Sequence, residues 1–149
     1  MPGGWTVRPW LHRMRGVKIG KNVWISQMVY IDENHPETIT IGNNCTIGIR
    51  TSIINHLYWG PLKKQNESIR ILIGNDVFIG PHCVILPNVQ IGDGAVVIAG
   101  TVVKNDIPPY TLWGQDTSQP LAKVTVTLTK EHSYEEFIRG LKPFRIHKS

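Results

Sequence analysis

The sequence repeats an apolar residue every six positions, and this period decides what the chain can fold into. The repeat forms four series of three positions, and all twelve positions hold Ile or Val. The series are Ile19, Ile25, Ile31; Ile41, Ile47, Ile53; Ile73, Ile79, Ile85; and Ile91, Val97, Val103. Because six is not a helical period, the pattern predicts short strands joined at corners. Three strands close a triangular coil, so we expect four stacked coils whose backbones pair with one another.

Composition supports an all-β interpretation of this repeat. The chain holds 19 Ile and 13 Val against 9 Leu and 3 Ala, and β-branched side chains favour strands. Gly follows the core position in six repeats. We interpret these glycines as corner residues whose backbone adopts a conformation that is unfavourable for other residues. These are Gly20, Gly42, Gly48, Gly74, Gly80 and Gly92.

The period breaks twice, and both breaks fall after the third strand of a coil. The interval from Ile31 to Ile41 is ten residues, and that from Ile53 to Ile73 is twenty. Both insertions therefore leave the same corner, one coil apart. Because loops on a rigid scaffold tend to carry function, we predict the active site at this corner.

His56 lies at the start of the longer insertion, in the run TSIINHLYWG. A neutral imidazole can deprotonate a hydroxyl near neutral pH. Asp32 and Glu33 lie on the preceding coil within expected reach of His56, where one carboxylate can fix the imidazole tautomer and the other can bind an acceptor. The alternatives are a surface histidine and solvated loop charges.

The repeats of residues 17–123, and the stretch IGDGAVVIAGTVVKNDIPPYT within them, resemble the hexapeptide-repeat acyltransferases. The likeness is greatest to sugar O-acetyltransferases of the galactoside and maltose acetyltransferase type. It implies a left-handed parallel β-helix of about four coils; the spacing alone fits either hand. It also implies acetyl-CoA as acyl donor, a sugar hydroxyl as acceptor, no metal, and homotrimers with sites between subunits. His56 matches the family's catalytic base.

The resemblance extends to the two substrate sites. For the acceptor it implies, together with the spacing, a set of polar and aromatic residues: Gln27, Asp32, Glu33, Asn34, Phe78 and His82. For the donor the resemblance implies a turn of small residues, formed by Ala99, Gly100 and Thr101, and a basic residue near the CoA phosphates, Lys104. It also implies that Trp113 stacks on adenine and that Lys123 ends the motif. The segment from Trp113 to Lys123 departs from the family pattern by a few inserted residues, and Gln27 stands where Asn is usual.

The coils need caps at both ends, because the end coils lack a neighbour. We predict an N-terminal cap over residues 1–16, the β-helix over 17–112 with an insertion at about 57–70, and a C-terminal cap over 113–149. In the last segment VTVTL alternates like a strand, and Ser133 is expected to N-cap a helix through Tyr134, Phe137 and Leu141 that Gly140 and Pro143 stop.

The remaining features restrict the functional classes. No nucleic-acid-binding motif, membrane-spanning run or signal peptide is evident, so we expect a cytoplasmic protein. Cys45 and Cys83 are expected to be small buried residues. No two His lie five apart, which argues against a zinc-dependent carbonic anhydrase on the same scaffold. An N-acetyltransferase for an aminosugar nucleotide and a non-catalytic β-helix subunit stay as alternatives.

Overall fold

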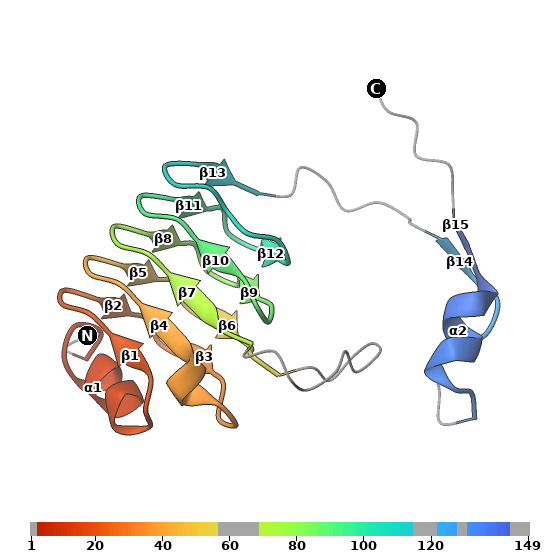
Figure 1. Cartoon of the computed structure of the whole chain (residues 1–149), viewed down its shortest axis with the longest axis horizontal. Helices are drawn as coiled ribbons and strands as arrows, with labels where there is room; N and C mark the ends of the chain where they lie inside the picture. Colours follow the sequence, from red (N-terminus) through yellow and green to blue (C-terminus); the bar gives the residue numbers. More distant parts are fainter. Residues whose placement is uncertain (1–2, 57–68, 115–121, 128–130, 144–149) are drawn as a thin grey trace. The chain divides into compact units, whose positions relative to one another are not determined.

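The computed structural model describes residues 3–56, 69–114, 122–127 and 131–143. The chain divides into two units, Met1–Gln115 and Asp116–Ser149, and each is described by itself (Figure 1). Within the described residues, no helix is long and apolar enough to cross a membrane.

Thirteen short strands of the first unit form three parallel sheets, one along each side of a triangular prism (Figure 1). The first sheet contains β1 (Lys18–Ile19), β4 (Ile39–Ile41), β7 (Ile71–Ile73) and β10 (Gln90–Ile91). The second contains β2 (Trp24–Ile25), β5 (Thr46–Ile47), β8 (Phe78–Ile79), β11 (Val96–Val97) and β13 (Leu112–Trp113). The third contains β3 (Tyr30–Ile31), β6 (Ser52–Ile53), β9 (Val84–Ile85) and β12 (Val102–Val103).

The six-residue period is confirmed strand by strand. Each of the twelve predicted core positions is the last residue of one of the strands β1 to β12, and all but Ile19 are buried. Equivalent residues face one another in register between coils, as Ile31, Ile53 and Ile85 do. A fifth coil begins where Ile107 bridges Ile91 and β13 pairs with β11. The prism is therefore the predicted parallel β-helix, with its core along the axis.

The glycines after the core positions have another physical reason than the predicted one. None of the six has a positive φ; along the first corner that conformation falls at the residue two positions later, such as Asn22 and Asn44. Gly42 is required because a Cβ there would lie 2.5 Å from the carbonyl oxygen of Gly74 on the next coil. The prediction of unusual backbone angles at these glycines is wrong, and close approach between coils replaces it.

Helix α1 (Val7–Met14) and the turn after it close the N-terminal end of the prism through arginine side chains. In later coils, the carbonyl of each core residue accepts a hydrogen bond from a backbone N–H of the preceding coil; the Ile41 carbonyl accepts one from Gly20 at 2.9 Å. The first coil has no preceding coil, and three arginines donate to its three core carbonyls instead. The bonds run from Arg13 to Ile19 at 3.1 Å, from Arg8 to Ile25 at 2.6 Å and from Arg15 to Ile31 at 2.9 Å.

We expect Arg8→Ala to lower the free energy of unfolding of the prism by about 1–3 kcal/mol, because it leaves a half-buried carbonyl without its charged donor. Urea unfolding followed by circular dichroism measures this. Lys21→Ala, which removes an exposed cation of the same coil, should change it by less than about 0.5 kcal/mol. Equal effects of the two substitutions would contradict the capping role.

His12 makes the cap sensitive to acid. Burial, followed by the nearby charge of Arg15, lowers the pKa of His12 from 6.5 to about 4. A lowered histidine pKa favours the folded state above pH 6.5, and this contribution is lost as pH falls from 6.5 to about 4. We expect His12→Gln to flatten the decline of unfolding free energy over that range. An unchanged pH profile would contradict this.

The second unit contains β14 (Ala122–Val124), α2 (Tyr134–Gly140) and β15 (Leu141–Pro143). Ser133 caps α2 as predicted, in a reciprocal capping box with Glu136. Of the strand predicted over VTVTL, Val124 lies in β14, residues 125–127 are not strand, and Leu128 lies outside the described residues. The strand lies at Ala122–Val124 because these residues pair antiparallel with Leu141–Pro143, and Leu141 therefore starts a strand instead of continuing the helix.

Candidate active site

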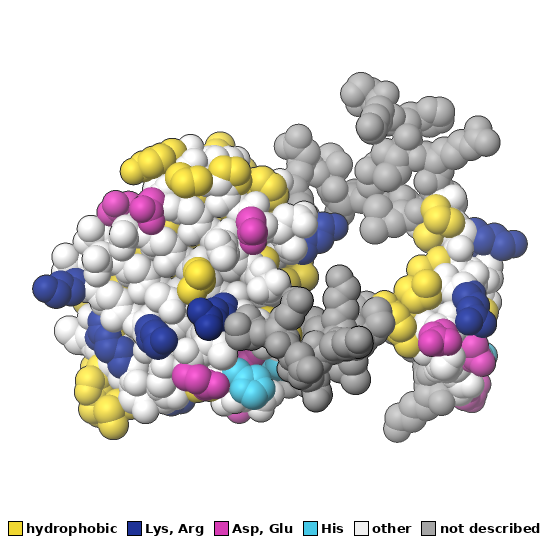
Figure 2. All heavy atoms as spheres, viewed as in Figure 1, with side chains coloured by type: hydrophobic (Ala, Val, Ile, Leu, Met, Phe, Trp, Pro, Cys, Tyr) yellow, Lys and Arg dark blue, Asp and Glu magenta, His cyan; other side chains and the backbone are white. Residues whose placement is uncertain are grey.

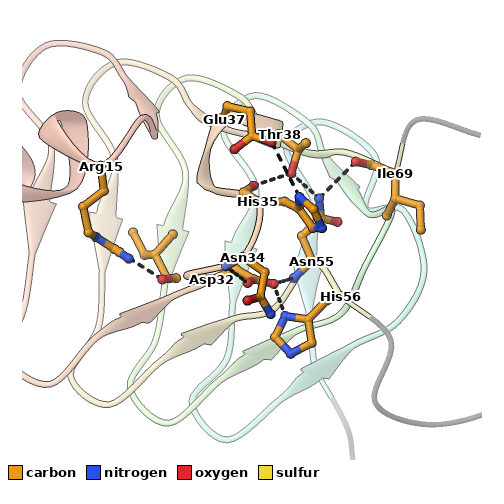
Figure 3. A network of polar contacts seen from close by, with 10 residues as sticks. Arg15, Asp32, Asn34, His35, Glu37, Thr38, Asn55, His56 and Ile69 are labelled. Carbon is orange, nitrogen blue, oxygen red and sulfur yellow. Dashed lines mark hydrogen bonds and ion pairs between the residues drawn. The ribbon is translucent and has the colours of Figure 1, made fainter.

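Both insertions leave the prism at its third corner, which follows the strands of the third sheet. Asp32 comes directly after β3, and His56 comes three residues after β6. Because β3 and β6 pair in parallel, with Ile31 opposite Ile53, the two side chains start from adjacent coils at the same corner. Figure 3 shows them pointing toward each other. The register of the repeat therefore creates this pair.

Asp32 is a fully buried carboxylate whose oxygens are all engaged by the chain. Its Oδ1 accepts the backbone N–H of Asn34 at 2.9 Å, and its Oδ2 accepts that of Asn55 at 2.6 Å and a hydrogen bond from His56 Nδ1. Burial by itself would raise the pKa of Asp32, but these hydrogen bonds outweigh it and hold the pKa below its usual value. Asp32 is therefore ionised at neutral pH.

The ionised carboxylate determines the tautomer of His56. A carboxylate can only accept, so Nδ1 of His56 carries the proton that it donates to Asp32. In the neutral imidazole, Nε2 then has no proton and is the nitrogen that can take one. The His56 side chain is 12% exposed and that of Asp32 0%, so the pair is largely shielded from solvent. This is the arrangement of an oriented general base.

Asn55 is a buried residue of this site that the sequence did not predict. Its backbone holds Asp32, and its side-chain Nδ2 donates to Thr38 Oγ1 and, at 3.0 Å, to the carbonyl of Ile69. Thr38 ends the short 3-10 helix η1 (Pro36–Thr38). Asn55, at the start of the second insertion, is thus bonded both to Thr38 of the first insertion and to Ile69, shortly before β7 (Figure 3). No feature of the sequence distinguishes Asn55 from an ordinary loop residue, because its partners Asp32, Thr38 and Ile69 are distant in the chain.

The structure separates the predicted acceptor residues into two groups. Asp32, Glu33 and Asn34 lie at the third corner with His56, and Glu33 and Asn34 are exposed there. Gln27 and His82 lie at the second corner, which joins the second sheet to the third, and Phe78 faces outward from β8. These are separate sides of the prism, so within one chain the second group does not line the same site as His56.

The predicted donor residues on the last full coil occupy the second and third corners. Ala99 and Gly100 are exposed at the second corner, where Gly100 has φ +74° and a Cβ would meet nothing within 4 Å. This corner is a bare stretch of backbone. Thr101 is buried, and its hydroxyl donates a hydrogen bond to the Ile98 carbonyl at 2.7 Å, so its side chain stabilises the turn of the second corner. Lys104 is exposed, directly after β12.

Two other predicted donor residues lie elsewhere. Trp113 is the inward residue of β13 and packs, partly buried, against the hydrophobic core, a structural role that the sequence did not predict. Lys123 is exposed on β14 in the second unit. As for the zinc-dependent alternative, the described ranges contain no group of three His, Cys, Asp or Glu side chains placed to hold a metal ion.

Comparison with known proteins places these features in context. Residues 70–105 match the family model described as bacterial transferase hexapeptide, six repeats. The Bacillus subtilis (strain 168) protein YvoF, whose name classes it provisionally as an acetyltransferase, is 43% identical over 103 residues, which cover 68% of this chain and 58% of YvoF. Galactoside O-acetyltransferase of Escherichia coli (strain K12) is 40% identical over 97 residues, covering 62% and 47% of the two chains.

A solved structure agrees with these relatives. The hexapeptide-repeat acetyltransferase of Vibrio cholerae, crystallised with acetyl coenzyme A, superimposes with a TM-score of 0.51 and 33% identity, over 63% of this chain and 52% of that chain. The likeness identifies the prism as a left-handed parallel β-helix. This chain spans only about half of the length of the curated relatives it matches.

Proposed function

We propose that this chain, a hexapeptide-repeat protein with acetyltransferases among its relatives, is an acetyl-CoA-dependent O-acetyltransferase that modifies a hydroxyl group of a sugar or saccharide. The observation that carries the proposal is the buried, ionised Asp32 that holds Nδ1 of His56. The sugar class rests on the likeness to galactoside O-acetyltransferase. Since acetyl-CoA is a donor available inside cells, the proposal places the reaction in the cytoplasm, with cell-surface polysaccharide biosynthesis as its use.

In the proposed reaction, His56 Nε2 takes the proton of the acceptor hydroxyl while the hydroxyl oxygen attacks the thioester carbonyl carbon. The carbon–sulfur bond then breaks, and the protonated His56 returns its proton to the departing thiolate, so the products are an acetyl ester and free CoA. Asp32 stabilises the imidazolium between these steps, because it is ionised and already bonded to Nδ1. Glu33 and Asn34, exposed beside this pair, are the proposed contacts to the acceptor.

The second corner of the last full coil fits the donor. Ala99 and Gly100 leave its backbone uncovered, so an extended pantetheine chain can approach it closely. Exposed Lys104 supplies a positive charge suited to CoA phosphates. The backbone at Thr101 and the partly buried side chain of Trp113 complete the proposed donor site on the prism. Lys123 lies in the second unit, and its contact with CoA stays a prediction from the sequence.

The donor and the base lie at different corners of one chain, separated by the third sheet. We therefore propose that a homotrimer forms each site from His56 of one copy and the second corner of another, which Gln27, Phe78 and His82 would also reach. Cyclic symmetry makes three equivalent sites from one such contact.

Complementation tests this arrangement. His56→Ala and Ala99→Trp are each expected to be inactive alone, because one lacks the base and the other blocks the donor corner. Mixed trimers from co-expression at equal amounts should regain about a quarter of wild-type activity, since one site in four then combines two intact halves. Absence of any recovery in mixed oligomers would contradict a site shared between copies.

A panel of acceptors tests the reaction itself. Release of CoA thiol from acetyl-CoA is measured with sugars, nucleotide sugars, aminosugar nucleotides and oligosaccharides, and the product is identified by mass spectrometry. Acceptor-dependent thiol release with an acetyl ester as product is the expected result. An acetamide product would assign the N-acetyltransferase alternative. No release with any acceptor, together with no acetyl-CoA binding by calorimetry, would assign the non-catalytic subunit.

A further inference from the structure

Helix α1 carries an exposed apolar stripe, of which Leu11 and Met14 also line a hollow beside Tyr30 of the first coil. Val7, Trp10, Leu11 and Met14 are all exposed, and their spacing of three and four residues places them along one side of the helix. Pro9 is the buried residue of the helix. A helix that only capped the prism would be expected to turn this side inward, so the stripe is available for a partner.

The polar side of α1 fixes this orientation. Arg8 and Arg13 donate to core carbonyls of the first coil, and Arg15, directly after the helix, does the same. These bonds hold the helix with its apolar side outward, because rotating it would leave strand carbonyls without donors. The exposed stripe is therefore a fixed feature of the cap.

Positive charge predominates in the sequence around the stripe, and Glu33 is the acidic side chain that lines a hollow with Leu11 and Met14. Residues 1–31 contain no Asp or Glu and five cations, which equals the net charge of +5 of the whole chain: Arg8, Arg13, Arg15, Lys18 and Lys21. Figure 2 shows hydrophobic side chains gathered over α1 with Lys and Arg side chains nearby. A partner for this face must therefore offer both an apolar phase and negative charge.

We propose that α1 docks the protein on an anionic lipid surface as an interfacial helix. Trp10, Leu11 and Met14 would enter the boundary between headgroups and acyl chains, and Lys18 and Lys21 would face lipid phosphates. A second copy of the chain fits less well, because it would bring two faces of the same positive charge together. The proposal goes beyond acetyl transfer and does not depend on it, since docking is measured without acetyl-CoA or acceptor.

Flotation of the full chain with vesicles tests this docking. Binding is expected to phosphatidylcholine vesicles that contain phosphatidylglycerol, to weaken with added salt, and to be much weaker with pure phosphatidylcholine. Lys18→Gln and Lys21→Gln should each lower the affinity about fivefold. Met14→Ser should weaken binding, whereas its matched control Met28→Ser should not: the two methionines are 69% and 66% exposed, but Met28 lies at the second corner. Thermal unfolding checks that each variant is folded.

Three outcomes would overturn the proposal. The first is no binding to anionic vesicles, and the second is equal binding to neutral and anionic vesicles. The third is equal binding by folded Met14→Ser and Met28→Ser. If Met14→Ser instead lowered the mass of the oligomer in sedimentation velocity while the wild type ignored vesicles, the face would be a contact between copies, and the lipid assignment would be wrong.

Discussion

We expect His56→Ala to lower kcat by about 10²–10⁴-fold at saturating acetyl-CoA and acceptor, because the variant lacks Nε2, the atom that takes the hydroxyl proton in the proposed reaction. The loss should fall on kcat, since the proposed donor corner lies on another side of the prism and keeps its contacts. Stopped-time assays of thiol release measure kcat, and calorimetry should give wild-type affinity for acetyl-CoA.

A second histidine provides the control for this substitution. His132 is exposed in the second unit, so His132→Ala should keep the wild-type kcat. Circular dichroism and thermal unfolding should show that both variants are folded. If folded His56→Ala turned over acceptor at the wild-type rate, His56 would not be the base.

Asp32→Asn is the second substitution with a large expected effect. The carboxylate of Asp32 now accepts hydrogen bonds from the backbone N–H groups of Asn34 and Asn55, among others. The amide of the variant would point an N–H toward one of these donors, so two donors would face each other. A buried donor left unsatisfied costs about 1–3 kcal/mol of unfolding free energy. The tautomer of His56 also loses its determinant, so kcat should fall by about 10²-fold or more. Combining Asp32→Asn with His56→Ala should add little further loss, because the two residues act as a unit.

The acid sensitivity of the wild type gives a separate readout for Asp32. Its folded pKa lies below the usual 3.8, so its contribution to stability is present above that pH and is lost as pH falls below it. In Asp32→Asn, the free energy of unfolding measured with urea should lack this part of its decline at low pH. Asp106→Asn serves as the matched control, since Asp106 is an exposed carboxylate that accepts one backbone N–H, from Gln90. Equal effects of the two variants on activity and on acid dependence would contradict the role of Asp32.

The repeat made most of the fold and the position of the base predictable. Each core residue performs the same task at the same spacing, so the period alone places all twelve strands. The lengths of the two insertions put Asp32 and His56 at one corner, because a parallel register brings equivalent positions of successive coils together. No tertiary information was needed for either step.

Features that depend on contacts between distant parts were not predictable. The reason for Gly42 is a carbonyl on the next coil, and the use of Arg8 as a cap depends on where α1 lies over the strand ends. Asn55 reads as an ordinary loop residue until both insertions close around it. Trp113 reads as a residue beyond the repeat, and its packing against the core follows from the fifth coil that pairs it with Val97.

Asp32 holds His56 in the tautomer whose Nε2 can accept a proton, and the tautomer of His56 can be measured without knowing the acceptor. Nitrogen-15 NMR of histidine-labelled protein at neutral pH distinguishes protonated from unprotonated ring nitrogens, and His56→Gln assigns the His56 signals by their loss. For the neutral form of the ring, we predict a proton on Nδ1 and none on Nε2, and we expect Asp32→Asn to change this pattern. A neutral His56 protonated at Nε2 in the wild type would contradict the account.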